Sequence, residues 1–358
     1  MSDRWKGFHV AAAHGNLRGP AQLVLTASVA RRYYLDGRSK VEIAEEFALS
    51  RFKVARLLDD ARTSGLVRIE IGHPGVVDVE LSARLMDALG LTHCVVTDTP
   101  DDHPATLREH LGVAAAELLT EIVLPDDVLG LSWARSVSAM AGALRALAPV
   151  SVVQLTGALA RPTGDDSSIE LVREVARVAG GPAYYFYAPM AVPDAATAMA
   201  LRGQPEVARA FGLIGSVTKA VAGVGAWEPE QSTLYDAIGD AERGELRRAG
   251  VCAEVSGVLI DTRGDPARAA LTERMIGITA AQMRAVPEVI GIVYGVAKTR
   301  AVLAAVRGGY IDSLVTHSTL ATALIEAVQV EKGQVVNAVP VQAAHIRTAQ
   351  VEAAQERG

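Results

Sequence analysis

The chain has 358 residues, half of them apolar and about a fifth charged, with a formal net charge of −6. This composition indicates a globular chain of about two domains. Two cysteines, Cys94 and Cys252, exclude a disulfide framework and a four-cysteine zinc site. No apolar run approaches the ~18–20 residues that cross a bilayer, and residues 1–20 lack the apolar core of a signal peptide. We therefore expect a cytoplasmic protein with no membrane partner.

The charge is unevenly distributed along the chain. Residues 1–20 and residues 21–72 each carry a formal charge of +2, so residues 73–358 carry −10. The net charge of the whole chain argues against nucleic acid as a partner, but its distribution makes the first part a candidate for DNA contact. We predict a disordered extension over 1–20, a DNA-binding domain over 21–72 and an effector-binding and oligomerisation domain over 73–358.

The first two helices of the predicted DNA-binding domain carry clear start and stop signals. Residues 23–35 have helical spacing and end at Asp36-Gly37, a helix stop. A second helix over 40–47 follows Ser39, and Glu42 completes a capping-box pattern with that serine.

A third helix is predicted over 51–63, after a short turn and the N-cap Ser50. Apolar residues at 54, 57, 58 and 61 form one buried stripe on this helix. Two short helices joined by a tight turn are typical of a helix-turn-helix. The alternating sequence of residues 66–71 then indicates the strand of a wing.

The outer face of the third helix carries the residue types that read DNA. An arginine such as Arg56 pairs with guanine through two hydrogen bonds, and Phe52 can pack on a thymine methyl group. The alternative interpretation is an ordinary surface helix with an exposed phenylalanine. The candidate DNA-binding residues are Ser50, Arg51, Phe52, Lys53 and Arg56.

The rest of the chain alternates between strand and helix patterns, which predicts a mainly parallel, doubly wound α/β sheet covered on both faces. The predicted strands are 94–98, 128–133, 152–155, 183–187, 219–225, 251–261, 289–295 and 313–316. The predicted helices are 105–121, 136–147, 168–179, 195–201, 205–211, 240–248, 280–286, 298–307 and 318–328. After Gln329 the only pattern is a possible strand over 334–341.

Ligands of such sheets bind beyond the carboxyl ends of the strands, and three of these ends carry suitable residues. Residues 130–136 offer helix-start amides, two hydroxyls and an arginine for a phosphate. Residues 294–298 place Lys298 near a helix start, and residues 154–157, followed by Asp165-Asp166, suit sugar hydroxyls. Glu254 and Asp261, in a hairpin over 251–261, could accept bonds from hydroxyl donors. The alternative interpretations are plain turn chemistry for the strand ends, a solvated helix residue for Lys298, and surface carboxylates for Glu254 and Asp261.

The first domain closely resembles the SorC-type bacterial transcriptional regulators in two stretches, YYLDGRSKVEIA over 33–44 and SRFKVARLL over 50–58. The body carries that family's other blocks in family order. They are GLSW at 130–133, VQLTG at 153–157, APM at 188–190, PDAAT at 193–197, GVGAW at 223–227, IGIT at 276–279 and LVT at 314–316.

The resemblance implies a winged helix-turn-helix on a body similar in fold to sugar-phosphate isomerases and CoA transferases. It also implies a homotetramer that binds double-stranded, pseudo-palindromic operator DNA under the control of a phosphorylated sugar. The effector phosphate would lie on residues 132–136 and on Lys298. The candidate effector-binding residues are Ser132, Trp133, Ala134, Arg135, Ser136, Gln154, Thr156, Gly157, Gly225, Glu254 and Lys298.

The sequence departs from the family pattern at four places. Ala134-Arg135-Ser136 replaces the Gly-Arg-Thr that is usual in the family, and Thr156-Gly157-Ala158 replaces Asn-Gly-Gly. Tyr294-Gly295 replaces Gly-Gly, and His317 replaces an aspartate. These changes suggest an unusual sugar or polyol phosphate, and we expect His317 to be an ordinary polar loop residue.

A rival hypothesis is a sugar-phosphate isomerase or deaminase that carries a DNA-binding head. Such an enzyme needs a positioned general acid and base, and the sequence shows no histidine–carboxylate pair at the strand ends, since Asp194, Glu254 and His317 are dispersed. Lys298 could capture an aldehyde effector as a Schiff base without turnover. We therefore predict a regulator with no catalytic residues, no metal and no cofactor.

Overall fold

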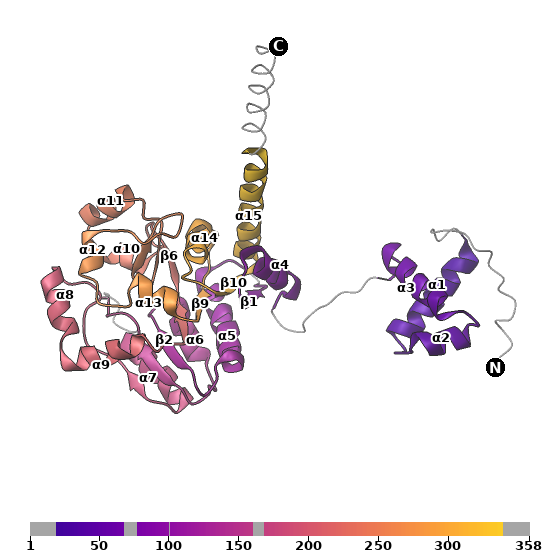
Figure 1. Ribbon diagram of the computed structural model, residues 1–358, viewed down its shortest axis with the longest axis horizontal. Coiled ribbons are helices and arrows are strands. Elements are labelled where there is room, and N and C mark those ends of the chain that lie inside the picture. The colour runs from indigo at the N-terminus through magenta and orange to yellow at the C-terminus, as the bar shows by residue number, and fades with distance from the viewer. Residues whose placement is uncertain (1–18, 68–76, 100, 160–167, 339–358) are drawn as a thin grey trace, which may run out of the picture. The chain divides into compact units, whose positions relative to one another are not determined.

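The computed structural model describes residues 19–67, 77–99, 101–159 and 168–338 (Figure 1). The chain divides into two compact units, Met1–Ile71 and Gly72–Gly358. Three predictions fall largely outside the described residues. They are the extension over 1–20, of which only Gly19 and Pro20 are described, the wing strand, of which residues 68–71 are left out, and Asp165-Asp166.

The first unit contains three helices, α1 (Pro20–Tyr34), α2 (Lys40–Glu46) and α3 (Arg51–Thr63). The predicted capping box is confirmed: the Glu42 amide donates to the Ser39 hydroxyl, and the Ser39 amide donates to the Glu42 carboxylate. The stripe on α3 is also confirmed, since all four of its apolar residues are buried in one small core with residues of α1 and α2. The three helices are therefore held together by the apolar side chains that the helical spacing of the sequence predicted to be buried.

The turn between α2 and α3 has one strained residue. Ala48 has a φ of 52°, in the left-handed region, which costs a residue with a Cβ roughly 1–2 kcal/mol. Glycine has no such penalty, although it loses more backbone entropy on folding. The chain thus keeps an alanine where the conformation favours glycine.

We expect Ala48→Gly to stabilise the first unit by up to about 1 kcal/mol. Glycine relieves the backbone strain at this position, and part of that gain is offset by the larger backbone entropy that glycine loses on folding. Hydrogen exchange of the α2 and α3 amides in the full chain would measure this as slower exchange. Ala55→Gly is the matched control, because Ala55 lies in mid-helix and the same change there should cost about 1 kcal/mol. Faster exchange of the α2 and α3 amides in Ala48→Gly than in the wild type would show that Ala48 does not strain the turn.

The second unit is built on a parallel sheet of seven strands in the order β1-β10-β9-β5-β2-β3-β4. These strands are β1 (Cys94–Thr97), β2 (Val128–Leu131), β3 (Ser151–Gln154), β4 (Ala183–Tyr184), β5 (Lys219–Ala222), β9 (Glu288–Ile292) and β10 (Ser313–His317). Most of their residues are buried and none is exposed, as expected for a sheet covered on both faces. The predicted doubly wound α/β fold is confirmed.

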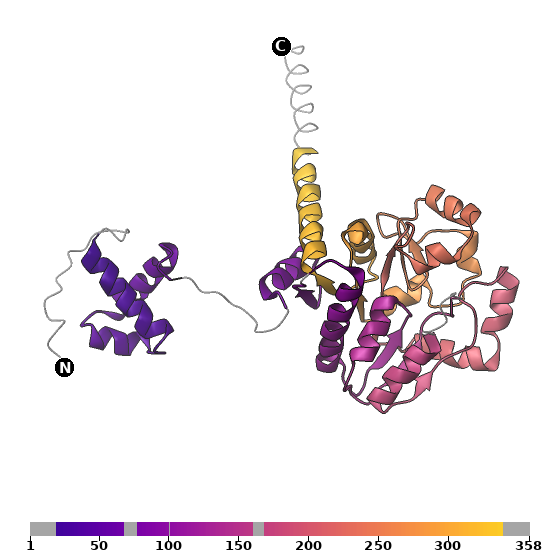
Figure 2. The ribbon, with the colours of Figure 1, turned by 180° about the vertical axis from the view of Figure 1, so that it is seen from behind.

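Two hydrophobic cores, one on each face of the sheet, attach the helices (Figures 1 and 2). One face packs against α5 (Pro104–Ile122), α6 (Arg135–Ala143) and α7 (Ser168–Ala179). The other packs against α4 (Val79–Leu89), α9 (Pro205–Ile214), α13 (Ala280–Ala285), α14 (Thr299–Arg307) and α15 (Ser318–Ala338). No helix of the described residues is long and apolar enough to cross a membrane.

A second, antiparallel sheet of three strands contains β6 (Val224–Ala226), β7 (Ala253–Val255) and β8 (Val258–Ile260). It divides one segment that was predicted as a single strand, because the strand over 219–225 breaks at Gly223 into β5 and β6. Residues 220–225 are alanine, valine and glycine, so the break at Gly223 carries no polar turn residue that would have predicted it. The predicted hairpin over 251–261 is confirmed, and it turns at Ser256-Gly257.

Other differences concern helices. The sequence analysis missed α4, α10 (Thr233–Ala237) and α12 (Ala270–Glu273), whereas α8 (Ala195–Arg202) and α11 (Asp240–Arg248) lie where they were predicted. The predicted strand over 334–341 is wrong as far as Ala338, because α15 continues through those residues.

The sheet has its topological switch point between β2 and β5. From β2 the chain passes through α6 to β3 and through α7 to β4, and then returns to the other side of β2 as β5. Loops that follow adjacent strands on either side of such a point diverge and leave a crevice. The residues after β2 and β5 are therefore where the fold itself predicts a ligand.

Candidate functional site

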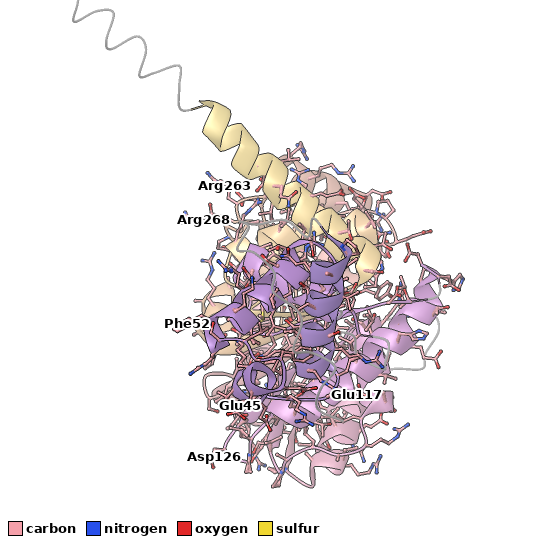
Figure 3. The ribbon with its side chains drawn as sticks, turned by 90° about the vertical axis from the view of Figure 1, so that its right-hand side faces the viewer. Glu45, Phe52, Glu117, Asp126, Arg263 and Arg268 are labelled. Atoms are coloured by element: carbon pink, nitrogen blue, oxygen red, sulfur yellow. The ribbon has the colours of Figure 1, made fainter. Side chains whose placement is uncertain are left out.

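The predicted DNA-reading residues lie on the exposed side of α3. Arg51, Phe52 and Arg56 are exposed and Lys53 is partly buried. Phe52 is 88% exposed, and Figure 3 shows it at the surface. Ser50 caps the helix, since its hydroxyl accepts the Lys53 amide at 3.2 Å. The first turns of α3 thus present an aromatic ring and two arginines to solvent.

A cavity of about 740 Å³ opens beyond the carboxyl ends of β2, β5 and β9. It contains the predicted effector-binding residues that follow β2 and the lysine turn that follows β9. Ten of the eleven candidates line it, namely Ser132, Trp133, Ala134, Arg135, Ser136, Thr156, Gly157, Gly225, Glu254 and Lys298. Segments far apart in the sequence therefore meet at the switch point.

Gln154 is the exception. It is fully buried, and its amide donates to the Thr156 carbonyl at 2.7 Å and to the Ser168 hydroxyl at 3.0 Å. Its carbonyl oxygen accepts the Phe186 amide at 3.1 Å. These partners leave Gln154 no role toward sugar hydroxyls, so that part of the prediction is wrong. The side chain instead fixes the backbone that carries Thr156 and Gly157.

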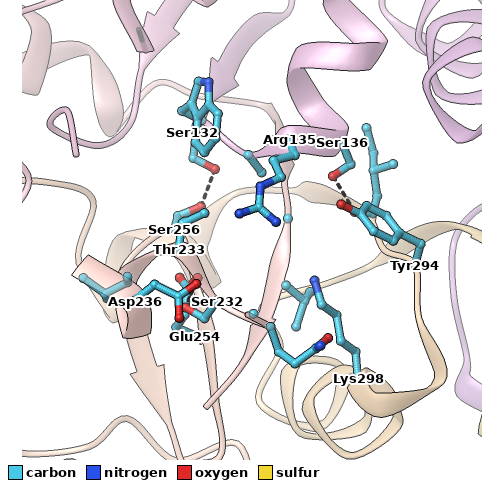
Figure 4. Close-up of a pocket in the computed structure, with 18 of the residues that line it drawn as sticks. Ser132, Arg135, Ser136, Ser232, Thr233, Asp236, Glu254, Ser256, Tyr294 and Lys298 are labelled. Atoms are coloured by element: carbon cyan, nitrogen blue, oxygen red, sulfur yellow. Dashed lines mark hydrogen bonds between the residues drawn. The ribbon is translucent and has the colours of Figure 1, made fainter. Parts of the chain in front are cut away.

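One end of the cavity is cationic. The N-terminus of α6 opens on it, with no side-chain cap at Ala134, and Figure 4 shows the Arg135 guanidinium extending into the space. The Ser136 hydroxyl donates to the Ile292 carbonyl at 2.8 Å, and the Ser132 hydroxyl accepts from Ser256 at 2.7 Å. Both hydroxyls therefore hold the loop in place. The features that suit an anion are the helix amides and the arginine.

Lys298 completes this cationic end. It closes a 3₁₀ turn, η1 (Val296–Lys298), and its Nζ lies 5.3 Å from the centroid of the Tyr294 ring. Burial lowers the pKa of Lys298 to about 8; Glu254 opposes that shift and Arg135 adds to it. A lysine pKa this low means that the site favours the arrival of a negative charge. We define Arg135, Lys298 and the N-terminus of α6 as the cationic end.

The facing side of the cavity carries the carboxylates of Glu254 and Asp236 (Figure 4). Glu254 on β7 accepts from the Ser232 hydroxyl and from the Gly257 amide, each at 3.1 Å. Burial raises the pKa of Glu254 above its usual range. Asp236 at α10 accepts the Glu230 amide at 3.1 Å. We define Glu254 and Asp236 as the carboxylate end.

The structure separates the two carboxylates that the sequence analysis treated together, Glu254 and Asp261. Glu254 is a cavity residue rather than a surface carboxylate. Gly225 leaves room for it, because a Cβ there would lie 2.6 Å from its Oε1 atom. Asp261 lies outside the cavity and accepts the amides of Arg263 and Asp265. Asp194 is the N-cap of α8.

The sequence analysis missed the residues that α10 and the β7–β8 turn contribute. These are Ser232, Thr233, Asp236 and Ser256. A signal was available for the first of them, because Ser232 is a good N-cap residue and its hydroxyl accepts the Tyr235 amide at 3.2 Å. The helix that it caps is only five residues long, too short to show periodicity.

His317 is not a loop residue. It ends β10, is 1% exposed, and its Nδ1 lies 3.3 Å from a carboxylate oxygen of Asp102. This corrects the expectation that no histidine–carboxylate pair occurs at the strand ends. Asp102 lines the cavity, whereas His317 lies behind the lining.

The model of the sugar-binding domain family, described as "Putative sugar-binding domain", matches residues 74–326. The chain is 26% identical over 302 residues to the "Uncharacterized transcriptional regulator YjhU" of Escherichia coli K12, covering 82% of this chain and 92% of that one. It is also 26% identical over 312 residues to the transcriptional regulator LsrR of Klebsiella pneumoniae, covering 85% and 94%.

The fold is shared with solved structures. The full-length sorbitol operon regulator SorC from Klebsiella pneumoniae superposes with a TM-score of 0.65 at 22% identity, over 85% of this chain and 99% of that one. A domain of a "possible sugar-binding transcriptional regulator" from Arthrobacter aurescens gives 0.63 at 22% identity, over 71% and 100%. These curated relatives and structural neighbours are regulators, not enzymes.

Proposed function

This chain belongs to the SorC-type family of sugar-binding transcriptional regulators, and from that premise we propose how its two units divide the work. The first unit binds operator DNA through α3. The second binds a phosphorylated sugar or polyol in the cavity at the switch point, and occupancy of the cavity changes the affinity for DNA. A DNA partner makes the cytoplasm the proposed compartment.

The observation that carries the effector proposal is the division of the cavity into a cationic and a carboxylate end. A phosphate would lie against Arg135, Lys298 and the N-terminus of α6, where amides and cations converge. Hydroxyl groups would donate to Glu254 and Asp236 on the facing side. The volume of about 740 Å³ suits a small metabolite. A sugar or polyol phosphate matches both ends at once.

The DNA proposal depends on the surface of α3. Arg56 would pair with a guanine and Phe52 would contact a thymine methyl group in the major groove, with Arg51 and Lys53 near phosphates. Because residues 21–72 carry a formal charge of only +2, a single first unit attracts the DNA phosphates weakly. We propose a homo-oligomer, a tetramer by family resemblance, that gathers several heads on a pseudo-palindromic operator and binds with strong salt dependence.

The test of the effector proposal is a thermal-shift comparison of matched ligand pairs. Sorbitol 6-phosphate and glucose 6-phosphate would be compared with unphosphorylated sorbitol and glucose, the polyol being chosen because a structural neighbour regulates a sorbitol operon. A ligand at a hundred times its Kd should stabilise the body by about 2.7 kcal/mol. Stabilisation only by the phosphorylated members supports the proposal, and equal stabilisation within each pair would contradict it.

A further inference from the structure

His317 lies between two parts of the cavity wall. Its Nε2 accepts the Gly295 amide at 3.1 Å, and Gly295 begins the turn that ends at Lys298. Its Nδ1 faces Asp102, 3.3 Å away, and Asp102 lines the cavity just before α5. One buried imidazole thus contacts the lysine turn on one side and the start of the α5 wall on the other.

The hydrogen bond fixes the protonation state that this arrangement needs. A ring nitrogen that accepts an N–H bond carries no proton, so the neutral ring has its proton on Nδ1, toward Asp102. A doubly protonated ring would set an N–H group against the Gly295 N–H group. Gly295 has a φ of 91°, a conformation in which only glycine is unstrained. Within the turn, the Lys298 amide donates to the Gly295 carbonyl at 3.0 Å. The bond from the Gly295 amide to His317 instead ties the turn to the end of β10, so loss of that acceptor would loosen the turn from the sheet.

We propose that neutral His317 is a positioning residue of the effector cavity, which holds the Gly295–Lys298 turn so that Lys298 meets the bound anion. The inference rests on the proposed effector site and adds a residue that never touches the ligand. A histidine here is also a departure from the aspartate usual in the SorC-type pattern. An aspartate would place a negative charge behind the wall of an anion site, whereas a neutral histidine accepts the Gly295 amide without adding a charge.

The groups that face His317 set the direction of its titration. Burial lowers the pKa of His317 below its ordinary value, and the Asp102 carboxylate opposes that shift. Asp102 is itself shared, since it accepts the Thr319 hydroxyl at 3.1 Å from α15. On β1, the neighbour in register is the uncharged Thr97. Among the described residues, Asp102 is the charged group recorded against the imidazole, and Lys298 lies in the turn that it holds.

The consequence is a bell-shaped pH dependence of anion affinity. Above pH 8 the affinity falls because Lys298 loses its proton. Below the pKa of His317 it falls again because the turn loses its acceptor. We call the fall in affinity at low pH the acid limb. If only charge mattered, affinity would rise at low pH instead, since a protonated histidine near the cavity attracts an anion. The sign of the acid limb therefore separates a positioning role from simple electrostatics.

Sulfate is the probe, because it stays doubly charged from about pH 5 to 9 and so contributes no titration of its own. Its affinity for the full chain would be followed by the change in tryptophan fluorescence, to which Trp133 in the cavity wall contributes. We expect affinity to fall as the pH is lowered below 6.5, with a slope of at most about tenfold per pH unit for the single proton involved. In His317→Gln, whose side-chain oxygen accepts a hydrogen bond without titrating, this acid limb should vanish while neutral-pH affinity stays within about twofold.

The outcomes are distinct. His317→Leu, which removes the acceptor, should lower sulfate affinity at every pH; if it does not fold, His317→Gln carries the test. A wild-type affinity that keeps rising to pH 5, or an acid limb that persists in His317→Gln, overturns the role of His317 and leaves the anion site intact. Absence of sulfate binding at every pH overturns the proposed site itself and this inference with it.

Discussion

Replacing Arg56 with alanine should weaken binding to operator DNA by about 1–3 kcal/mol and relax the preference for the base that the arginine reads. Arg56 is exposed on the face of α3 opposite its buried stripe. A bidentate arginine–guanine pair supplies discrimination of this size, and alanine supplies none. Gel shifts of the full chain on its operator, and on operators changed one base pair at a time, would measure both effects.

The matched control for this prediction is Arg62→Ala. Arg62 is also exposed and also on α3, but it lies in the last turn, away from the helix start that enters a groove. Loss of one positive charge should lower affinity modestly and equally for all sequences. Equal losses in the two variants, with unchanged base preference, would show that Arg56 is only a general cation.

Replacing Lys298 with methionine should abolish the response to the effector and leave DNA binding in its absence unchanged. The substitution removes the one cation that reaches the cavity from the β9 side, and a charge-assisted bond to phosphate contributes about 1.5–3 kcal/mol. Arg300→Ala is the matched control, because Arg300 is exposed two residues on and does not line the cavity.

The same variant makes a second, independent prediction about stability. Folding lowers the pKa of Lys298 from 10.5 to about 8, so the folded chain disfavours the charged form, and near pH 7 that charge opposes folding. The effector-free melting temperature of Lys298→Met should therefore equal or exceed that of the wild type. A variant that melts lower and still responds to effector would assign Lys298 to the structure rather than to the site.

The local signals in the sequence were sufficient for the first unit and for the positions of most strands. Ser39, Glu42 and Ser50 act on backbone within three residues, so their roles do not depend on the tertiary fold. The predicted SorC-type resemblance is confirmed by the family match over 74–326. A signal for α4 was present but unused, since Asp78 caps its start and Gly90 follows its end in the left-handed conformation.

The side chains that were misjudged from the sequence depend on contacts between distant segments. Gln154 resembles a ligand-binding side chain until Phe186 and Ser168 are seen to saturate it. Glu254 looks like a surface carboxylate until β6 and β7 pair and place it over Gly225. His317 becomes informative only because β10 ends beside the turn after β9.

We propose that occupancy of the cavity controls the affinity of α3 for DNA. This coupling is measured by the Kd of the full chain for the DNA upstream of its own gene, with and without the phosphorylated ligand that stabilises the chain. We expect the Kd to change about five- to 150-fold, a coupling of about 1–3 kcal/mol, with no change for the unphosphorylated ligand or in Lys298→Met. An operator Kd that stays the same when the cavity is saturated would show that the two units are not coupled.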